Sequence, residues 1–242
     1  MLDSLNEYRK NVTSQAGEDG IIEYLCARLG IQSGWCVEFG AWDGKHLSNT
    51  WNLIQNGWSG VLIEGNKEKA ESLNALYVKN PSVYTICAYV GFDESDQNGL
   101  DALLSATPTP KKFELLSIDI DGNDWYVWNA MKNYQPAVVI IEANSSIPAS
   151  VSKVHPVNSG GGASARALVE LARCKGYELV AHTGNCIFVR SDLYPKVDLQ
   201  DNSLDILFDT RFLCDEKKNL RTKLLTVGKN SLSKIINIIP SS

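Results

Sequence analysis

The stretch VEFGAWDGKH, residues 37–46, decides the fold. An apolar run starts at residue 35 and continues into this stretch. Two glycines, Gly40 and Gly44, follow the run, with Asp43 between them. An apolar run that ends in a glycine turn is typical of a buried β-strand followed by a loop and a helix. The stretch therefore predicts the first strand of a parallel sheet with helices on both faces.

The same alternation continues on both sides of this stretch. An amphipathic helix is expected before it at residues 17–29, with Ser14 as its cap. Because strands alternate with helices of moderate length, right-handed crossovers should connect them into a doubly wound α/β sheet. Further strands are expected at residues 60–63, 83–87, 115–120 and 137–141, and further helices at 47–58, 67–79, 97–105 and 125–131.

The last part of the sheet is expected to differ from the rest. A glycine-rich loop at residues 159–162 leads into an amphipathic helix, and two strands at 177–181 and 186–190 follow it closely. Four turn-forming residues, 182–185, separate these two strands, which predicts a hairpin. One strand should therefore run antiparallel to an otherwise parallel sheet.

Two regions of the chain are distinguished by composition. Residues 1–190 carry all the expected strands, whereas residues 191–242 are more polar and predict short helices near 204–213 and 231–239. The second region is interpreted as a helical extension, which serves either as a cap on the active site or as an oligomer contact.

Composition excludes several classes of protein. Apolar residues make up 44% and charged residues 21%, which is ordinary for globular domains and not for disordered chains. The net charge of −5 offers no broad basic surface, so nucleic acid is not an expected partner. No apolar run reaches the roughly 18 residues of a membrane span, and no leader peptide is evident at the start. We therefore expect a cytoplasmic protein.

The strand ends point to the ligand, because open parallel sheets bind ligands beyond the carboxyl ends of their strands. Glu38 and Asp43 bring negative charge to the first loop, which suits a cation better than a diphosphate. Glu64 ends the second strand about 24 residues after Gly40, near the spacing of an acid that binds both ribose hydroxyls. This pattern favours a positively charged nucleoside such as S-adenosylmethionine, and the alternative is a tight turn without a ligand.

Six motifs stand in order along the chain: SQAGEDG (14–20), VEFGAWDGKHLSNT (37–50), GWSGVLIEG (57–65), LLSIDIDGNDWYVW (115–128), VVIIEAN (138–144) and GASARALVELARCKGYELVAHTGNCIFV (162–189). Together they resemble the FkbM-like class I S-adenosylmethionine-dependent methyltransferases, over roughly residues 12–190. The resemblance implies a Rossmann-like sheet of seven strands with the last one reversed, and sugars or intermediates of surface polysaccharide biosynthesis as acceptors. It also implies that the amino-terminal motif, with Gln15, closes over the cofactor. The expected cofactor contacts are Gln15, Glu38, Gly40, Asp43, Glu64 and Asp119.

Acids and an amide also follow the fourth and fifth strands, whose ends are neighbours in such a sheet. Asp119, Asp121, Glu142 and Asn144 offer the hard oxygen ligands of Mg²⁺ or Mn²⁺. The set resembles that of metal-dependent catechol-type O-methyltransferases, except that a residue separates Glu142 from Asn144. The alternative is that Asp119 binds backbone amides and Asp124 caps the following helix.

A general base is needed when a hydroxyl or amine accepts a methyl group. Asp121 and His155 are the predicted catalytic residues, with His182 as a further candidate at the hairpin turn. The sequence thus predicts a methyltransferase that acts on an oxygen of a small polar acceptor, either a sugar or a phosphorylated metabolite. Two rivals stay open, a nicotinamide-dependent oxidoreductase and a non-catalytic nucleoside-binding module.

Overall fold

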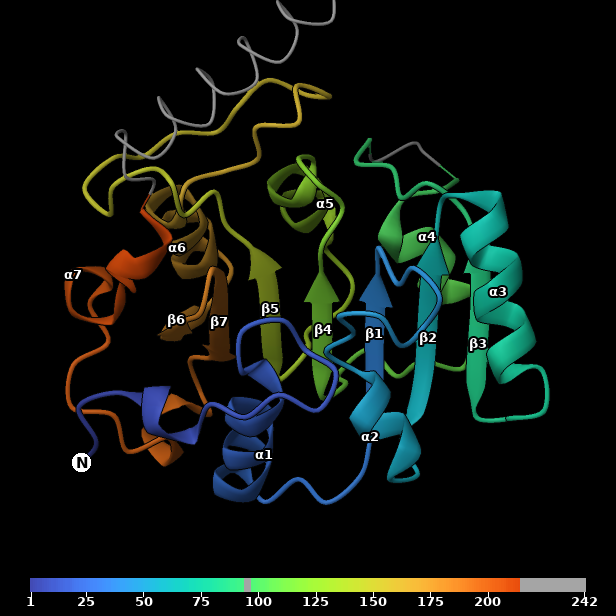
Figure 1. Ribbon diagram of the computed structural model, residues 1–242, viewed down its shortest axis with the longest axis horizontal. Coiled ribbons are helices and arrows are strands. Elements are labelled where there is room, and N and C mark those ends of the chain that lie inside the picture. Colours follow the sequence, from blue (N-terminus) through green and yellow to red (C-terminus); the bar gives the residue numbers. More distant parts are fainter. Residues whose placement is uncertain (94–96, 214–242) are drawn as a thin grey trace, which may run out of the picture.

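A computed structural model describes residues 1–93 and 97–213 of the chain (Figure 1). A sheet of seven strands forms its centre, in the order β3-β2-β1-β4-β5-β7-β6. Strand β7 pairs antiparallel with both neighbours, and the other pairings are parallel. The predicted topology, including the single reversed strand, is confirmed. The strands are β1 Trp35–Phe39, β2 Ser59–Glu64, β3 Val83–Cys87, β4 Leu115–Ile118, β5 Val138–Glu142, β6 Tyr177–His182 and β7 Asn185–Arg190.

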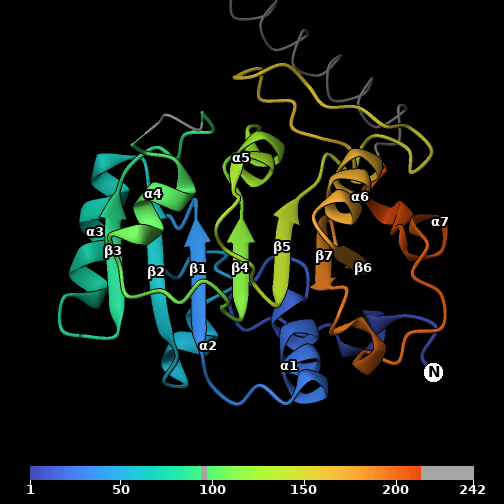
Figure 2. The ribbon, with the colours of Figure 1, turned by 180° about the vertical axis from the view of Figure 1, so that it is seen from behind.

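Helices cover both faces of the sheet, which explains why its central strands are mostly apolar and almost entirely buried. Helices α1, α2 and α3 lie on the face turned toward the viewer in Figure 1, and α4, α5 and α6 lie on the opposite face, seen in Figure 2. All four residues of β4 and the first four of β5 are buried. The helices are α1 Glu18–Leu29, α2 Trp51–Gln55, α3 Lys67–Tyr77, α4 Leu100–Ser105, α5 Asp124–Ala130, α6 Ala165–Cys174 and α7 Leu204–Leu207.

Two predicted helices are shorter than the sequence pattern indicated. The helix expected over residues 47–58 is confined to α2, because Leu47 has a φ of 54° and Ser48 to Thr50 form a loop around a buried acid. The helix expected over residues 204–213 is divided into α7 and the 3₁₀ turn Thr210–Phe212. The helix expected near residues 231–239 lies outside the described residues.

Residues 191–213 pack against the sheet domain. Val197 and Leu204 are buried in its hydrophobic core, and Leu199 forms a parallel bridge with Leu2 near the amino terminus. The Tyr24 hydroxyl of α1 also donates a hydrogen bond to the Val197 carbonyl, at 2.8 Å. This segment therefore shares the core of the domain. Within residues 1–93 and 97–213, no helix has both the length and the apolar character needed to cross a membrane.

Candidate active site

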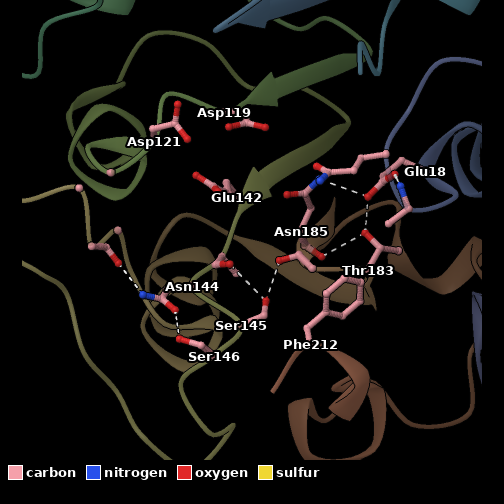
Figure 3. Close-up of a pocket in the computed structure, with 18 residues that line it drawn as sticks. Glu18, Asp119, Asp121, Glu142, Asn144, Ser145, Ser146, Thr183, Asn185 and Phe212 are labelled. Atoms are coloured by element: carbon pink, nitrogen blue, oxygen red, sulfur yellow. Dashed lines mark hydrogen bonds between the residues drawn. The ribbon is translucent and has the colours of Figure 1, made fainter. Parts of the chain in front are cut away.

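A cavity of about 320 Å³ opens at the carboxyl ends of β4 and β5 (Figure 3). The loops after these two strands form one side of it, and the β6–β7 turn forms the other. The amino-terminal motif and the glycine-rich loop complete the wall, so segments distant in sequence meet around one volume. We call this cavity the acidic pocket. Its lining includes Gln15, Glu18, Asp119, Asp121, Glu142, Asn144, Ser145, Gly160, Gly161, Gly162, Thr183, Asn185 and Phe212.

Three carboxylates meet in the acidic pocket. Asp119 follows β4 directly and Glu142 is the last residue of β5, so the parallel register of the two strands places them side by side. Each of Asp119, Asp121 and Glu142 has a carboxylate oxygen within 4.8 Å of those of the other two. In the described part of the chain, none of these side chains accepts a hydrogen bond or forms an ion pair. The pocket therefore gathers three acidic side chains, and no cationic side chain lines it among the described residues.

Desolvation and the charges of neighbouring acids raise the pKa of Asp119 and of Glu142. The pKa of Asp119 rises to about 7, first through desolvation and then through the charges of Asp124 and Asp121. The pKa of Glu142 rises to about 8, again through desolvation first and then through Asp119. No lysine, arginine or histidine is among the described residues that line the pocket. A bound cation would remove this repulsion.

Asp121 is presented on a tight loop between β4 and α5. It has a φ of 56°, in the left-handed region that is uncommon for residues other than glycine. The buried carboxylate of Asp124 holds this loop by accepting hydrogen bonds from the backbone N–H groups of Ile120 (2.8 Å) and Gly122 (2.9 Å). Glycine suits position 122, because a Cβ there would approach the Gly160 Cα to 3.1 Å and because the φ of 137° is one that other residues rarely adopt. Asp124 thus fastens the loop that carries Asp121.

The Asn144 amide is already engaged within the wall of the pocket. Its Nδ2 donates to the Gly161 carbonyl at 2.7 Å, and its Oδ1 accepts from the Ser146 hydroxyl at 2.5 Å (Figure 3). The bond to Gly161 joins the loop after β5 to the glycine-rich loop, and the bond from Ser146 lies within the loop after β5. A metal ion would have to share the Asn144 oxygen with Ser146.

Glu18 ties the amino-terminal motif to the hairpin of β6 and β7. Its Oε1 accepts hydrogen bonds from Thr183 Oγ1 (2.6 Å) and Asn185 Nδ2 (3.2 Å), and its Oε2 accepts one from the Ala16 N–H (2.7 Å). Glu18 is fully buried, so this arrangement is a structural clamp. It places Gln15, a predicted cofactor contact, on the rim of the acidic pocket.

Glu38 does not line the acidic pocket. Its buried carboxylate accepts hydrogen bonds from Ser48 Oγ (2.6 Å), Thr50 Oγ1 (2.7 Å) and the Asn49 N–H (2.8 Å). These bonds shape the loop that leads into α2. The structure therefore gives Glu38 a supporting place beneath the first loop.

The other first-loop residues also have local partners. A Cβ on Gly40 would lie 1.6 Å from the Asp119 carbonyl oxygen, so only glycine allows β1 and β4 to end side by side. Asp43 accepts hydrogen bonds from the N–H groups of Lys45 (3.0 Å) and His46 (2.7 Å). Neither Gly40 nor Asp43 lines the acidic pocket.

Glu64 joins the end of β2 to the first loop. One of its carboxylate oxygens accepts the Trp42 N–H at 2.9 Å and the other accepts the Asn66 N–H at 2.7 Å. A carboxylate oxygen has two lone pairs, so each oxygen retains capacity for a further donor. This geometry is compatible with the two hydroxyls of a ribose.

The two candidate histidines occupy different surroundings. His155 lies behind the glycine-rich loop, where a Cβ on Gly161 would come within 2.4 Å of its ring, and it does not line the acidic pocket. His182 is buried, and its Nδ1 accepts the Asp209 N–H at 3.0 Å. The proton therefore belongs on Nε2, which lies 2.8 Å from Ser145 Oγ. Burial lowers the pKa of His182 to about 4, so this ring is neutral and structural.

The sequence patterns did not point to two of the residues that line the pocket. Phe212 belongs to the carboxy-terminal segment, and its ring contacts the position of Gly184 at the hairpin turn. Ser145 follows the predicted ligand Asn144 but carries no motif of its own. An aromatic residue in a polar tail has no sequence signal that marks it as a pocket residue.

No family model and no curated protein matches the chain. Among solved structures, it is similar to the O-methyltransferase TomG from Streptomyces achromogenes in complex with SAM, at 18% identity and a TM-score of 0.46, covering 78% of this chain and 87% of that one. It is also similar to magnesium protoporphyrin IX methyltransferase from Synechocystis with bound SAM, at 11% identity and a TM-score of 0.44, covering 72% and 78%. Likenesses of this size do not identify a function. The strand order β3-β2-β1-β4-β5-β7-β6, with β7 reversed, is that of a Rossmann-like, doubly wound α/β fold.

Proposed function

We propose that this chain is an S-adenosylmethionine-dependent methyltransferase that methylates an oxygen of a small polar acceptor. The observation that carries the proposal is the acidic pocket, whose three carboxylates lack a positive partner among the described residues. It lies at the carboxyl edge of the sheet, where open α/β sheets bind their ligands. The sulfonium and amino groups of S-adenosylmethionine supply the positive charge that such a pocket favours.

The cofactor would extend from the acidic pocket toward the end of β2. Gln15 and Asp119 would contact it from the pocket, and the free lone pairs of Glu64 would accept the ribose hydroxyls. Gly40 and Asp43 belong to the loop between these two places, and Glu38 supports that loop from beneath. This assignment rests on two positions: Gln15 and Asp119 line the acidic pocket, and Glu64 is the last residue of β2, at the carboxyl edge of the sheet.

Asp121 is the proposed general base. Its carboxylate lines the acidic pocket, and Asp124 fixes the loop that presents it. When bound, S-adenosylmethionine supplies a methyl group activated by the sulfonium. Asp121 would orient the acceptor hydroxyl and take its proton as oxygen bonds to the methyl carbon, while the bond from that carbon to sulfur breaks and S-adenosylhomocysteine leaves. His155 is the second proposed base, and it would need access past Gly161.

A divalent cation is a further proposed occupant of the acidic pocket. The carboxylates of Asp119, Asp121 and Glu142, all within 4.8 Å of one another, are the hard oxygen donors that Mg²⁺ and Mn²⁺ prefer. Asn144 would add an amide oxygen while keeping its Nδ2 bond to Gly161. When bound, the ion would lower the pKa of the acceptor hydroxyl. In that case Asp121 would serve as one of the ligands of the ion.

The proposed acceptors are sugars or phosphorylated intermediates of surface polysaccharide biosynthesis. The ordered motifs shared with FkbM-like methyltransferases support this choice. Phe212 supports the interpretation of the carboxy-terminal segment as a cap, because it lines the pocket. An aromatic ring at that position is suited to stack on the apolar face of a sugar.

A transfer assay tests the proposal. The full chain is incubated with methyl-labelled S-adenosylmethionine and a panel of nucleotide sugars and phosphorylated metabolites, and products are analysed by mass spectrometry. We expect one class of acceptor to gain a methyl group, with a rate at least a hundredfold lower in Asp121→Asn, since general bases contribute about 10²–10⁴-fold. Glu71→Gln, an exposed acid on α3, serves as the control. NADH binding without methyl transfer would favour the oxidoreductase, and cofactor binding without any product would favour the nucleoside-binding module.

A further inference from the structure

A second cavity, of about 370 Å³, adjoins the acidic pocket. The two cavities share Ala16 and Phe212 in their walls, so they are neighbours across the amino-terminal motif and the carboxy-terminal segment. We call the second one the basic pocket. Its wall also includes Arg9, Lys10, Asn11, Gly17 and Arg211. Among the described residues that line it, three are cationic and none is acidic.

The arginines of the basic pocket carry more positive charge than their shared partner neutralises. The Asp209 carboxylate lies 2.9 Å from a guanidinium nitrogen of Arg9 and 2.6 Å from one of Arg211. Hydrogen bonds from Arg211, followed by those from Arg9, hold the pKa of Asp209 well below its usual range. A single carboxylate between two guanidinium groups leaves a net positive charge. Arg9 is further fixed by its 2.7 Å bond to the His182 carbonyl.

Lys10 adds another positive charge at the edge of this pocket. Its Nζ lies 3.4 Å from the Glu23 carboxylate, and the two side chains are 63% and 69% exposed. An exposed pair of this kind contributes at most about 1 kcal/mol and leaves the ammonium free to move to a better partner. Glu23 does not line the basic pocket. The pocket therefore has an excess of positive charge in a chain whose net charge is −5.

We infer that the basic pocket binds a phosphate group of the methyl acceptor. Guanidinium and ammonium groups are the protein donors best suited to phosphate oxygens. Because Ala16 and Phe212 line both pockets, an acceptor that extends past these two residues would place its reacting hydroxyl in the acidic pocket and its phosphate in the basic pocket. Opposite charges in adjoining pockets would fix the direction in which the acceptor lies. This inference rests on the proposed function, which places the acceptor in the acidic pocket.

Anion titrations test the inference. Inorganic phosphate and acetate are titrated by calorimetry, at fixed ionic strength, into the full chain and the double variant Lys10→Gln/Arg211→Gln. We expect phosphate to bind more tightly than acetate, and the double variant to bind it about fivefold more weakly, the effect of about 1 kcal/mol. Lys79→Gln/Arg173→Gln, which removes one exposed lysine and one exposed arginine elsewhere, is the matched control and should bind phosphate normally. Thermal unfolding of each variant shows that it is folded.

The same samples are titrated with S-adenosylhomocysteine to separate the two claims. Weaker phosphate binding in the Lys10/Arg211 variant, with unchanged affinity for S-adenosylhomocysteine, supports the inference. If the unaltered chain binds S-adenosylhomocysteine but not phosphate, or if both double variants lose phosphate binding equally, the inference is overturned and the proposed function stands. Equal binding of acetate and phosphate would overturn the choice of phosphate. Absence of S-adenosylhomocysteine binding would contradict the proposed function, and with it the role of the basic pocket in holding an acceptor.

Discussion

The carboxylates of Asp119 and Glu142 lie side by side at the ends of β4 and β5, with oxygens within 4.8 Å of each other. The described residues around them supply no positive charge, and burial raises the pKa of both groups. Two neighbouring acids that the surrounding protein partly desolvates destabilise the folded chain when both are ionised. A cationic ligand would relieve that repulsion, which is why the site is better understood as a binding site than as a structural element.

Divalent cations should stabilise the folded chain through this pair. At a Mn²⁺ concentration ten times the dissociation constant, binding adds about 1.4 kcal/mol of stability, which corresponds to a rise of about 4 °C in the melting temperature. Glu142→Gln should lose most of the rise because it removes one ligand charge. Thermal unfolding with and without Mn²⁺ provides the measurement, with Glu71→Gln as control. An equal rise in Glu142→Gln would show that the ion binds elsewhere.

Glu64 should contribute to cofactor affinity. Glu64→Ala is expected to weaken S-adenosylhomocysteine binding at least tenfold, about 1.4 kcal/mol, because the ribose hydroxyls lose their acceptor. Isothermal titration measures this loss. Since Glu64 also holds the Trp42 and Asn66 N–H groups, Glu64→Gln is the companion variant that retains an acceptor. Unchanged affinity in Glu64→Ala would remove Glu64 from the cofactor site.

Glu38 should matter for stability more than any surface acid. Glu38→Ala leaves the hydroxyls of Ser48 and Thr50 and the Asn49 N–H without their acceptor in a buried place. We expect a loss of about 3 kcal/mol in the free energy of unfolding, as is typical when a buried charged partner is deleted. Urea denaturation measures it, with Glu71→Ala as the exposed control. A loss no greater than that of the control would refute the supporting role of Glu38.

His182 should make the chain sensitive to acid. Its folded pKa of about 4 is below the ordinary 6.5, so the unfolded chain binds more protons between these values and stability falls as pH decreases through them. Between pH 7 and pH 5, the titration of His182 should lower the free energy of unfolding by about 2 kcal/mol. Urea denaturation at both pH values should show a smaller loss in His182→Gln, which has no imidazole to protonate. Identical losses in the two proteins would mean that His182 does not titrate in this way.

The sequence predicted the sheet well because the information is local. Four strands, β1, β2, β4 and β5, are largely apolar runs that end at or directly before an acid or a glycine, and the turn residues 182–185 marked the reversed strand. The pattern over residues 47–58 overstated α2 because apolar spacing does not reveal that Glu38 reorganises the loop before it. The apolar spacing favours a helix from residue 47, but the hydrogen bonds of residues 48–50 to Glu38 stabilise a loop, so the helix begins only at Trp51.

The candidate site was predicted only in part. Asp119, Asp121, Glu142 and Asn144 line one pocket, as expected from neighbouring strand ends. Glu38 and Gly40 carry the residue types of a binding loop, yet both have packing partners that only the folded chain reveals. Phe212 reaches the pocket from a segment far along the chain, and sequence spacing contains no information about such a contact.

A titration with S-adenosylmethionine and S-adenosylhomocysteine tests the central claim most directly. The two molecules differ by one methyl group and one positive charge, so their difference in affinity isolates the attraction between the sulfonium and the acidic pocket. We predict that both bind to the full chain with one site each, more tightly than NAD⁺. Asp119→Asn should weaken S-adenosylmethionine about fivefold more than S-adenosylhomocysteine, roughly 1 kcal/mol. Binding of NAD⁺ alone, or no binding of either sulfur nucleoside, would contradict the account.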